Sequence, residues 1–441
     1  MQTHLADWIK DTPEGIAAEA ILRKCVHCGF CNATCPTYQL RGDELDGPRG
    51  RIYLIKQMLE GEPVSARTGL HLDRCLTCRA CETTCPSGVQ YGKLVDIGRA
   101  VAAQKLQRPW FDRLQRFALA SVLPRPWLFA RLVMLGRWFR AFMPATLAAK
   151  VPAVAPAAGH WPGRGGAPRH ARRMLALAGC VQPTLSPDIN AAAARVLDRI
   201  GISLIEAAGA GCCGALRFHL DYQADGRDDM RRLIDAWWPL VERGEIEAIV
   251  MTASGCGATV KEYGHHLAHD PAYRDKAARI SAMTRDLSEV LHAERALIET
   301  ALETALETTL ETTLETTSAR LASRTTGKPA PRSIAFHPPC TLQHGQQLRG
   351  MAEGILSAAG FTLVPVPDAH LCCGSAGTYS LLQPALSMEL QANKVAALQS
   401  GDATMILTAN IGCQSHLAAA ARLPVRHWVV ALDERLAETK A

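Results

Sequence analysis

The amino-acid sequence predicts a multidomain α and α/β protein, in which an α-helical N-terminal domain precedes two repeated α/β domains. Two runs of four cysteines, separated by a helical pattern, indicate the N-terminal domain. A cysteine spacing that occurs twice in the rest of the chain indicates the repeat. Short apolar runs alternate there with helical patterns, which is typical of an α/β sheet. With 441 residues, the chain is long enough for about two to four domains.

The composition excludes several classes of protein. Hydrophobic residues make up 48% of the chain and charged residues 20%, so global disorder is excluded. Residues 1–15 contain no apolar segment typical of a secretory signal, and we expect a cytoplasmic protein. In that reducing compartment, 16 cysteines favour metal or redox chemistry over disulfides. The longest charge-free runs, residues 369–388 and 403–421, are too polar to span a membrane.

The first cysteine set lies in residues 1–100, which we predict to be a ferredoxin domain. Both runs read Cys-x2-Cys-x2-Cys-x3-Cys-Pro. Three thiolates at this spacing surround one face of a [4Fe-4S] cluster, and the fourth, before the proline, ligates the other cluster in two-cluster ferredoxins. We therefore predict two [4Fe-4S] clusters. Their ligands are Cys25, Cys28, Cys31 and Cys85 for the first, and Cys35, Cys75, Cys78 and Cys81 for the second.

The segment between the runs favours a helical ferredoxin. Pro48 can begin a helix that continues to Leu59 and ends at Gly61. Gly29, inside the first run, would let the backbone approach a cluster closely. Two zinc sites of four cysteines each are the alternative, but zinc ribbons use two CxxC pairs and not a run that ends in Cys-Pro.

The other eight cysteines form two matching groups. From the lone cysteine to the cysteine pair is 32 positions in both copies, and from the pair to the last cysteine is 43 and 40 positions. The lone cysteines follow short apolar runs, so we expect each group to converge at the carboxyl ends of parallel strands. A further cluster, a zinc ion or no metal are all compatible with four thiols. The groups are Cys180, Cys212, Cys213 and Cys256 in residues 171–296, and Cys340, Cys372, Cys373 and Cys413 in residues 331–441.

Several histidines lie close to these cysteines in the sequence. His337 and His344 flank Cys340, as they would around a nucleophilic cysteine, but the repetition of the cysteine pattern argues against that role. We interpret the following histidines as surface residues or as supports for ligands: His265, His266, His337 and His416.

Residues 101–170 are predicted to be a basic amphipathic arm followed by a linker rich in Pro, Ala and Gly. Residues 101–173 hold 13 Lys and Arg against a single acid, Asp112. Apolar side chains recur at helical spacing, with arginines between them, at Leu128, Leu132, Leu135 and Phe139. Such a helix suits anionic lipid or an acidic partner, and packing on its own protein is the alternative. No nucleic acid is expected as a partner, because no recognised binding module accompanies the arm.

Residues 297–330 are predicted to be a low-complexity insertion. The sequence LETA is followed by repeats of LETT with a period of four. A strict four-residue period drifts around a helix of 3.6 residues per turn, so these leucines cannot share one buried stripe. We expect a solvated segment without a catalytic role.

Two ferredoxin-type runs followed by two cysteine–CCG–cysteine units resemble the family that joins a two-cluster ferredoxin to paired CCG domains. That family includes iron–sulfur subunits of glycolate oxidase and anaerobic glycerol-3-phosphate dehydrogenase, lactate-utilisation proteins and heterodisulfide reductase. The likeness to the glycolate oxidase subunits is carried by CVHCGFCNATCPTYQLRGDELDGPRGRIYLIKQ, HLDRCLTCRACETTCPSGV, TASGCGATVKEYG, HLCCGSAGTYSL and TANIGCQSHLA. Cys256 and Cys413 each stand alone where heterodisulfide reductase has CxxC, so five-thiolate clusters are not expected.

The resemblance implies an oxidoreductase complex. In it, a partner flavoprotein would oxidise glycolate to glyoxylate, or D-lactate to pyruvate. This chain would pass the electrons towards the quinone pool or another acceptor, at the cytoplasmic face of the inner membrane. No catalytic residue is predicted, because the sequence shows neither a flavin motif nor an acid–base constellation. A related glycerol-3-phosphate or lactate dehydrogenase is the alternative, and a zinc-stabilised binding module is the alternative of another class.

Overall fold

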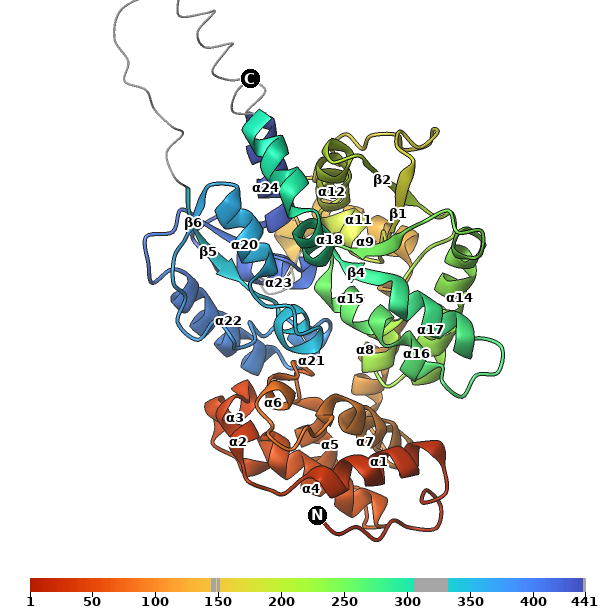
Figure 1. Cartoon of the computed structure of the whole chain (residues 1–441). Helices are drawn as coiled ribbons and strands as arrows, with labels where there is room; N and C mark the ends of the chain where they lie inside the picture. Colours follow the sequence, from red (N-terminus) through yellow and green to blue (C-terminus); the bar gives the residue numbers. More distant parts are fainter. Residues whose placement is uncertain (144–147, 149–150, 305–331, 439–441) are drawn as a thin grey trace, which may run out of the picture.

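The computed structural model describes residues 1–143, 148, 151–304 and 332–438 (Figure 1). An all-helical N-terminal domain lies below two α/β domains, which stand side by side. Each α/β domain is built on a four-stranded parallel sheet. The predicted fold class is therefore confirmed.

The N-terminal domain is a set of short helices around one apolar core. Its elements are α1 (Pro13–Lys24), α2 (Phe30–Ala33), α3 (Pro36–Arg41), η1 (Glu44–Asp46), α4 (Pro48–Leu59), α5 (Ala66–Asp73), α6 (Ala80–Thr83) and α7 (Tyr91–Lys105). The predicted helix is α4, which begins at Pro48, where the missing N–H costs no hydrogen bond. It packs against α1 and α7 through Ile55 and Leu59. The cysteine runs lie on either side of α4 in the sequence and surround its first turn.

The arm consists of α8 (Trp110–Val122), α9 (Pro126–Trp138) and the short helix η2 (Arg140–Phe142). Ion pairs fasten its start to both neighbouring domains: the Arg108 guanidinium lies 2.7 Å from Asp73 and 2.9 Å from Asp221. The helix predicted around Leu128, Leu132 and Leu135 is α9, which ends at Trp138, one residue before Phe139. Among the described residues, no single helix is long and apolar enough to cross a membrane; α8 and α9 meet that measure only together, and they are bent by 110°.

The two sheets have the same topology, with orders β2-β1-β3-β4 and β6-β5-β7-β8. The first contains β1 (Arg172–Ala176), β2 (Ile202–Glu206), β3 (Ala248–Met251) and β4 (Thr284–Asp286), and the second contains β5 (Arg332–His337), β6 (Phe361–Leu363), β7 (Met405–Thr408) and β8 (Val425–His427). The apolar runs expected before the lone cysteines are β1, β3, β5 and β7. All pairings are parallel, with Leu175 opposite Ile205 and Ala335 opposite Ile406. The predicted repeat is therefore a structural repeat.

Helices cover both faces of each sheet. The first domain contains α11 (Gln182–Leu185), α12 (Asp188–Arg199), α13 (Ala215–His219), α14 (Gln223–Glu242), α15 (Ser254–Lys261), α16 (Tyr263–His266), α17 (Arg274–Met283) and α18 (Leu287–Ala293). The second contains η3 (Thr341–Gly345), α20 (Met351–Ala358), α21 (Tyr379–Leu382), α22 (Pro384–Leu398), α23 (Ile411–Ala418) and α24 (Trp428–Glu438). Among the helical patterns that the sequence places between the strands are those that form α12 and α20.

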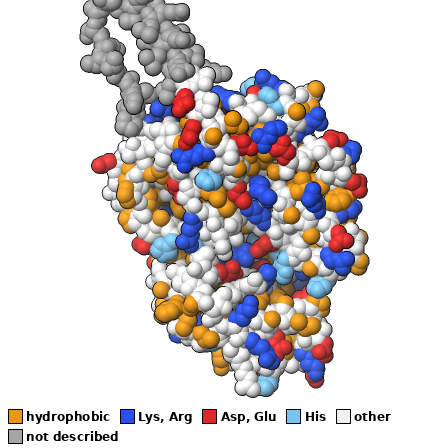
Figure 2. Space-filling view, in the orientation of Figure 1, with side chains coloured by type: hydrophobic (Ala, Val, Ile, Leu, Met, Phe, Trp, Pro, Cys, Tyr) orange, Lys and Arg blue, Asp and Glu red, His pale blue; other side chains and the backbone are white. Residues whose placement is uncertain are grey.

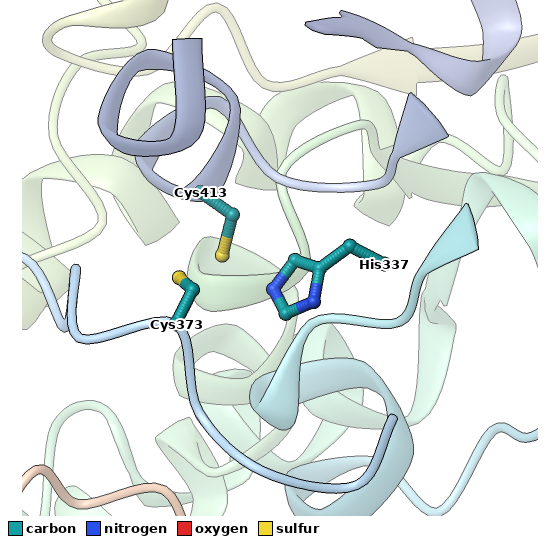
Figure 3. A group of neighbouring side chains, drawn as sticks. All are labelled: His337, Cys373 and Cys413. Carbon is teal, nitrogen blue, oxygen red and sulfur yellow. The ribbon is translucent and has the colours of Figure 1, made fainter. Parts of the chain in front are cut away.

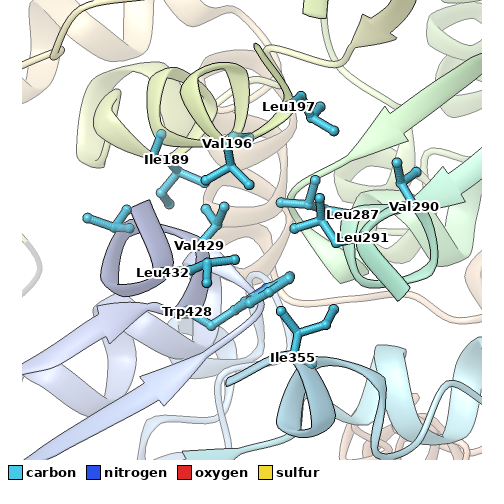
Figure 4. Packing of buried hydrophobic residues seen from close by; sticks show 14 of the residues in the cluster. Ile189, Val196, Leu197, Leu287, Val290, Leu291, Ile355, Trp428, Val429 and Leu432 are labelled. Atoms are coloured by element: carbon cyan, nitrogen blue, oxygen red, sulfur yellow. The ribbon is translucent and has the colours of Figure 1, made fainter. Parts of the chain in front are cut away.

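The two α/β domains share one hydrophobic core. Helices α12 and α18 of the first domain meet α20 and α24 of the second, and Trp428 lies among them (Figure 4). The start of the predicted insertion contributes to this core, because residues 295–304 are helical and bury Ile298 and Leu302. Up to residue 304 this segment thus packs one face, through Ile298 and Leu302, and leaves other side chains such as Leu297 exposed; the repeats from residue 305 onward lie outside the described residues.

Candidate iron–sulfur and metal sites

The cysteines of the N-terminal domain gather around two hollows. Cys25, Cys28, Cys31 and Cys85 line the first, of about 430 Å³, together with Pro48. The set takes its last cysteine from the second run, as the crossed assignment predicts. Burial, together with the nearby Cys25 and Cys85 thiols, raises the pKa of the Cys31 thiol to about 11. An iron cation bound to this sulfur would lower the pKa of the thiol instead, because its positive charge favours the thiolate form.

The second hollow, of about 290 Å³, is lined by the other crossed set. Its cysteines are Cys35, Cys75, Cys78 and Cys81. Cys81 also lines the first hollow, so the two sites adjoin. Two neighbouring spaces with four thiols each match the donor set of two [4Fe-4S] clusters. We therefore infer that these eight cysteines fit the two [4Fe-4S] clusters that the cysteine spacing predicts.

The cysteine loops have an unusual backbone in both runs. His27 and Gly29 have positive φ angles of 57° and 87°, and Thr77 and Arg79, at the same places in the second run, have 51° and 61°. A β-branched threonine rarely adopts this conformation, and such strain tends to occur at functional sites. Alternating left-handed residues turn successive N–H groups to one side, as in anion-binding nests. Thr77 N donates to the Cys75 sulfur at 3.4 Å in this way.

A buried ionic network adjoins the second hollow. Asp46 is fully buried and lies 2.8 Å from both His71 Nδ1 and the Arg74 guanidinium. Arg51, which is 1% exposed, donates to the His71 carbonyl and lies 3.9 Å from the Cys35 sulfur. A buried positive charge beside a cluster ligand favours the more negative, reduced state. Spacing arguments did not find Arg51, because it reaches the site from the first turn of α4, outside both cysteine runs.

Hydroxyl groups also touch the sulfurs of this second site. Tyr91, at the start of α7, donates its hydroxyl to the Cys75 sulfur at 3.6 Å. Thr37 Oγ1 lies 3.3 Å from the Cys35 sulfur and donates to the Asp46 carbonyl. Such hydrogen bonds tune the potential of a cluster.

In both α/β domains the four predicted cysteines come together at the carboxyl edge of the sheet. In the first, Cys212 lies within hydrogen-bonding reach of Cys180 and Cys213. Cys213 in turn reaches Cys256, which lies in the first turn of α15. The second domain repeats this chain of thiols. There Cys340 donates to Cys372 at 3.6 Å, Cys372 reaches Cys373, and Cys373 reaches Cys413 in the first turn of α23.

The glycine of each CCG sequence is required by the backbone. Gly214 and Gly374 have φ angles of +84° and +88°. A Cβ on Gly374 would lie 2.6 Å from the Ser387 carbonyl oxygen, and one on Gly214 would lie 2.5 Å from that of Gly226. The glycine thus lets the cysteine pair pack directly on a helix, α14 or α22, which explains why it follows the pair in both copies.

The second CCG set lies against the ferredoxin domain. Cys372 is buried in a cluster with Leu76, Tyr379 and Leu386, and Cys78 and Cys340 pack on that cluster. Burial raises the pKa of Cys78, and the nearby Cys340 thiol raises it further. Contacts between the domains surround this point: Tyr379 donates to the Arg74 carbonyl at 3.2 Å, and Thr83 Oγ1 lies 2.9 Å from His344 Nδ1. The second CCG site and the second ferredoxin site are therefore neighbours.

The histidines that we interpreted as surface residues or supports for ligands occupy both kinds of position. His265 is exposed and His266 is half-buried, whereas His337 and His416 are buried. His337 moreover lies among the cysteines of the second CCG set. The sequence contained one signal for this, namely that His337 ends an apolar strand three residues before Cys340.

Comparison with known proteins agrees with this architecture. The 4Fe-4S dicluster domain matches residues 21–89, and the cysteine-rich CCG domain matches residues 174–261 and 334–418. The glycolate oxidase iron–sulfur subunit of Escherichia coli (strain K12) is 52% identical over 436 residues, which cover 99% of both chains. The chain belongs to the family of glycolate oxidase iron–sulfur subunits.

Two more distant relatives define the breadth of the likeness. A probable glycolate oxidase iron–sulfur subunit of Bacillus subtilis (strain 168) is 29% identical, over 90% of this chain and 88% of the relative. Lactate utilization protein A of Geobacillus thermodenitrificans (strain NG80-2) is 24% identical, over 53% of this chain and 85% of the relative. This member of the glycolate oxidase iron–sulfur subunit family therefore carries the ferredoxin sites and both CCG sites on a single chain.

Proposed function

We propose that this chain is the electron-transfer subunit of a glycolate-oxidising complex, and that it serves a flavoprotein subunit that oxidises glycolate to glyoxylate, with D-lactate as a second substrate. The observation that carries the proposal is the pair of adjoining hollows, each lined by one crossed set of four cysteines, with Cys81 of the second set also lining the first hollow. Two [4Fe-4S] clusters held there would each carry one electron at a time, as a flavin partner and a quinone acceptor require. The family membership supplies the substrate class.

The two sites are arranged for passage through the subunit. Cys28 is exposed at the first hollow, whereas the second lies between the ferredoxin domain and the second CCG domain. Apolar side chains gather on the side of the N-terminal domain where α2 and α3 lie (Figure 2), and Val26 and Phe30 beside the first hollow are 68% and 61% exposed. We propose that a redox partner docks on this face.

A cysteine variant tests the electron-transfer role. In the purified complex, Cys78→Ser is expected to leave the reduction of flavin by glycolate unchanged and to abolish the reduction of quinone. Stopped-flow absorbance of the flavin and of the quinone follows the two half-reactions separately, so the first serves as the control for the second. Loss of flavin reduction itself, or quinone reduction at the wild-type rate, would overturn the proposal. Replacing glycolate by D-lactate, L-lactate or glycerol 3-phosphate in the first half-reaction identifies the donor.

We further propose that the complex sits at the cytoplasmic face of the inner membrane, held there in part by the arm. Several apolar side chains that recur here at helical spacing are exposed: Leu132 and Leu135 on α9, and Phe139 directly after it. Only Val133 and Gly136 of this helix are buried. Arg131 stacks on Trp127 at 5.5 Å, and a basic aromatic face of this kind is suited to anionic lipid. The exposure of the stripe favours this view over an arm packed on its own protein.

A further inference from the structure

Three elements of the second CCG domain bring a histidine and two cysteines to one point. His337 ends β5, Cys373 lies in the loop before α21, and Cys413 lies in the first turn of α23. One imidazole nitrogen and the two sulfurs all lie within 4.8 Å of one another. Figure 3 shows both sulfurs on the side of the imidazole ring that faces the space between the three residues.

The imidazole of His337 has no hydrogen-bonding partner among the described residues. The residue is 1% exposed, and neither Nδ1 nor Nε2 is within hydrogen-bonding reach of a donor or acceptor there. Buried polar groups nearly always have a hydrogen-bonding partner. A buried imidazole without one among the described residues therefore indicates a bound ligand as its partner.

The spacing of the three atoms suits one metal ion. A tetrahedral zinc ion with Zn–S bonds of about 2.3 Å holds its ligand atoms about 3.8 Å apart, which small side-chain rotations reach from the observed arrangement. A cubane cluster places iron and sulfide between its ligands and needs thiolates that stand farther apart. Two sulfurs and one imidazole nitrogen are also ligand types that zinc prefers.

The charge balance points the same way. Two thiolates, a neutral imidazole and a divalent cation sum to zero, so the occupied site would add no net charge beside the apolar Ala335, Ile406 and Leu417. The buried Lys394, whose positive charge acts on Cys373, favours the thiolate form. Asn410 Nδ2 donates to the Cys413 sulfur at 3.5 Å and supports its thiolate form.

The first CCG domain lacks the nitrogen ligand. Leu177 stands three residues before Cys180, as His337 stands three residues before Cys340, and Leu177 is buried among apolar side chains. The repeats therefore share their cysteines but differ at this position. We propose that the second CCG domain binds a single divalent ion of the zinc class through His337, Cys373 and Cys413, with a fourth position left open by these three residues.

Metal analysis of the full chain, purified anaerobically and loaded with Zn²⁺, tests this site independently of electron transfer. We expect one zinc per chain besides the ferredoxin iron, and X-ray absorption at the zinc edge should show sulfur and imidazole ligands. His337→Leu, which installs the residue of the first repeat, should lower the zinc content at least tenfold. His337→Cys should retain zinc with an all-sulfur pattern.

His344→Gln is the matched control, because this nearby buried histidine has both nitrogens engaged, by Thr83 Oγ1 and by the His370 carbonyl. It should keep the zinc. The visible absorption of the ferredoxin clusters reports whether each variant is folded, and Cys413→Ser provides a second ligand variant. A wild-type chain that binds no zinc, or unchanged zinc in His337→Leu, would overturn the proposal. So would extra iron with acid-labile sulfide that survives His337→Leu.

Discussion

Cys35 and Cys85 each line the hollow formed by the other cysteine run. This crossing predicts which cluster each cysteine supports. Cys35→Ser should remove the cluster of Cys75, Cys78 and Cys81 and leave the other intact, and Cys85→Ser should do the reverse. Iron and sulfide counting should give about half the wild-type value in each variant, and electron paramagnetic resonance of the reduced chains should show two different remaining signals. Identical remaining signals would contradict the crossed assignment.

Tyr91 offers a way to tune one cluster without removing it. Its hydroxyl, 3.6 Å from the Cys75 sulfur, stabilises negative charge there. A hydrogen bond to a charged group contributes about 1.5 kcal/mol of stabilisation. Both oxidation states of the cluster accept this bond, so only the difference between its energies in the two states shifts the potential. Tyr91→Phe should therefore lower the potential of this cluster by about 20–60 mV. Redox titration measures the shift, and Tyr53→Phe, on an exposed ring of α4, should leave both potentials unchanged.

Single residues also show where sequence reasoning succeeds and where it stops. The cysteines could be assigned because cluster ligation imposes a local spacing, Cys-x2-Cys-x2-Cys, that survives in the linear sequence. Arg51 and His337 could not, because each reaches its site through the packing of elements distant in the chain. His337 was interpreted as a surface or supporting residue, yet it is buried beside Cys373 and Cys413. Its place at the end of an apolar strand, three residues before Cys340, indicates proximity to the cysteines but does not show whether the imidazole is hydrogen-bonded in the core.

At the level of elements, the strands were predictable because each is a short apolar run between helical patterns, as in buried parallel sheets. The structure of the segment after α18 was less predictable. Its four-residue period suggested a solvated stretch, but the first turns after Glu294 continue as a helix that buries Ile298 and Leu302. Ile298 precedes the strict repeat, and one turn separates it from Leu302, so the two share a face even though a longer repeat would drift.

The prediction for this element concerns the arginines of the arm, of which Arg131 and Arg137 lie on α9 and Arg140 begins η2. Replacing Arg131, Arg137 and Arg140 by Gln should weaken binding of the complex to vesicles containing anionic lipid by about 100-fold, since each basic residue near such a surface contributes about 1 kcal/mol. Co-sedimentation at low and high salt measures this. The control replaces Arg232, Arg274 and Arg279, which lie on α14 and α17, and removes the same charge. Binding that is equal in both triple variants would show that the arm is not the contact.

At the level of the whole molecule, the domains are coupled through their interfaces. The ferredoxin domain meets the first α/β domain through Arg79 and Glu262, 2.6 Å apart, and meets the second through Tyr379 and Thr83. The two α/β domains share one core between α12, α18, α20 and α24 (Figure 4). Sequence spacing revealed the repeat but not this arrangement, because interfaces between domains depend on which apolar helix faces are left over after each sheet is covered.

The shared core predicts that the two α/β domains unfold as one unit. Trp428 is 1% exposed and belongs to a core cluster that includes residues of both domains. Trp428→Ala should destabilise the protein by about 3–5 kcal/mol, the usual cost of removing a large buried aromatic side chain. Hydrogen exchange should then accelerate in β1 and β5 together, although only one domain carries the change, whereas Trp110→Ala, on a side chain that is 73% exposed, should alter neither. Exchange that accelerates in β5 alone would show that each domain is held by its own core, because loss of the shared contacts must release both.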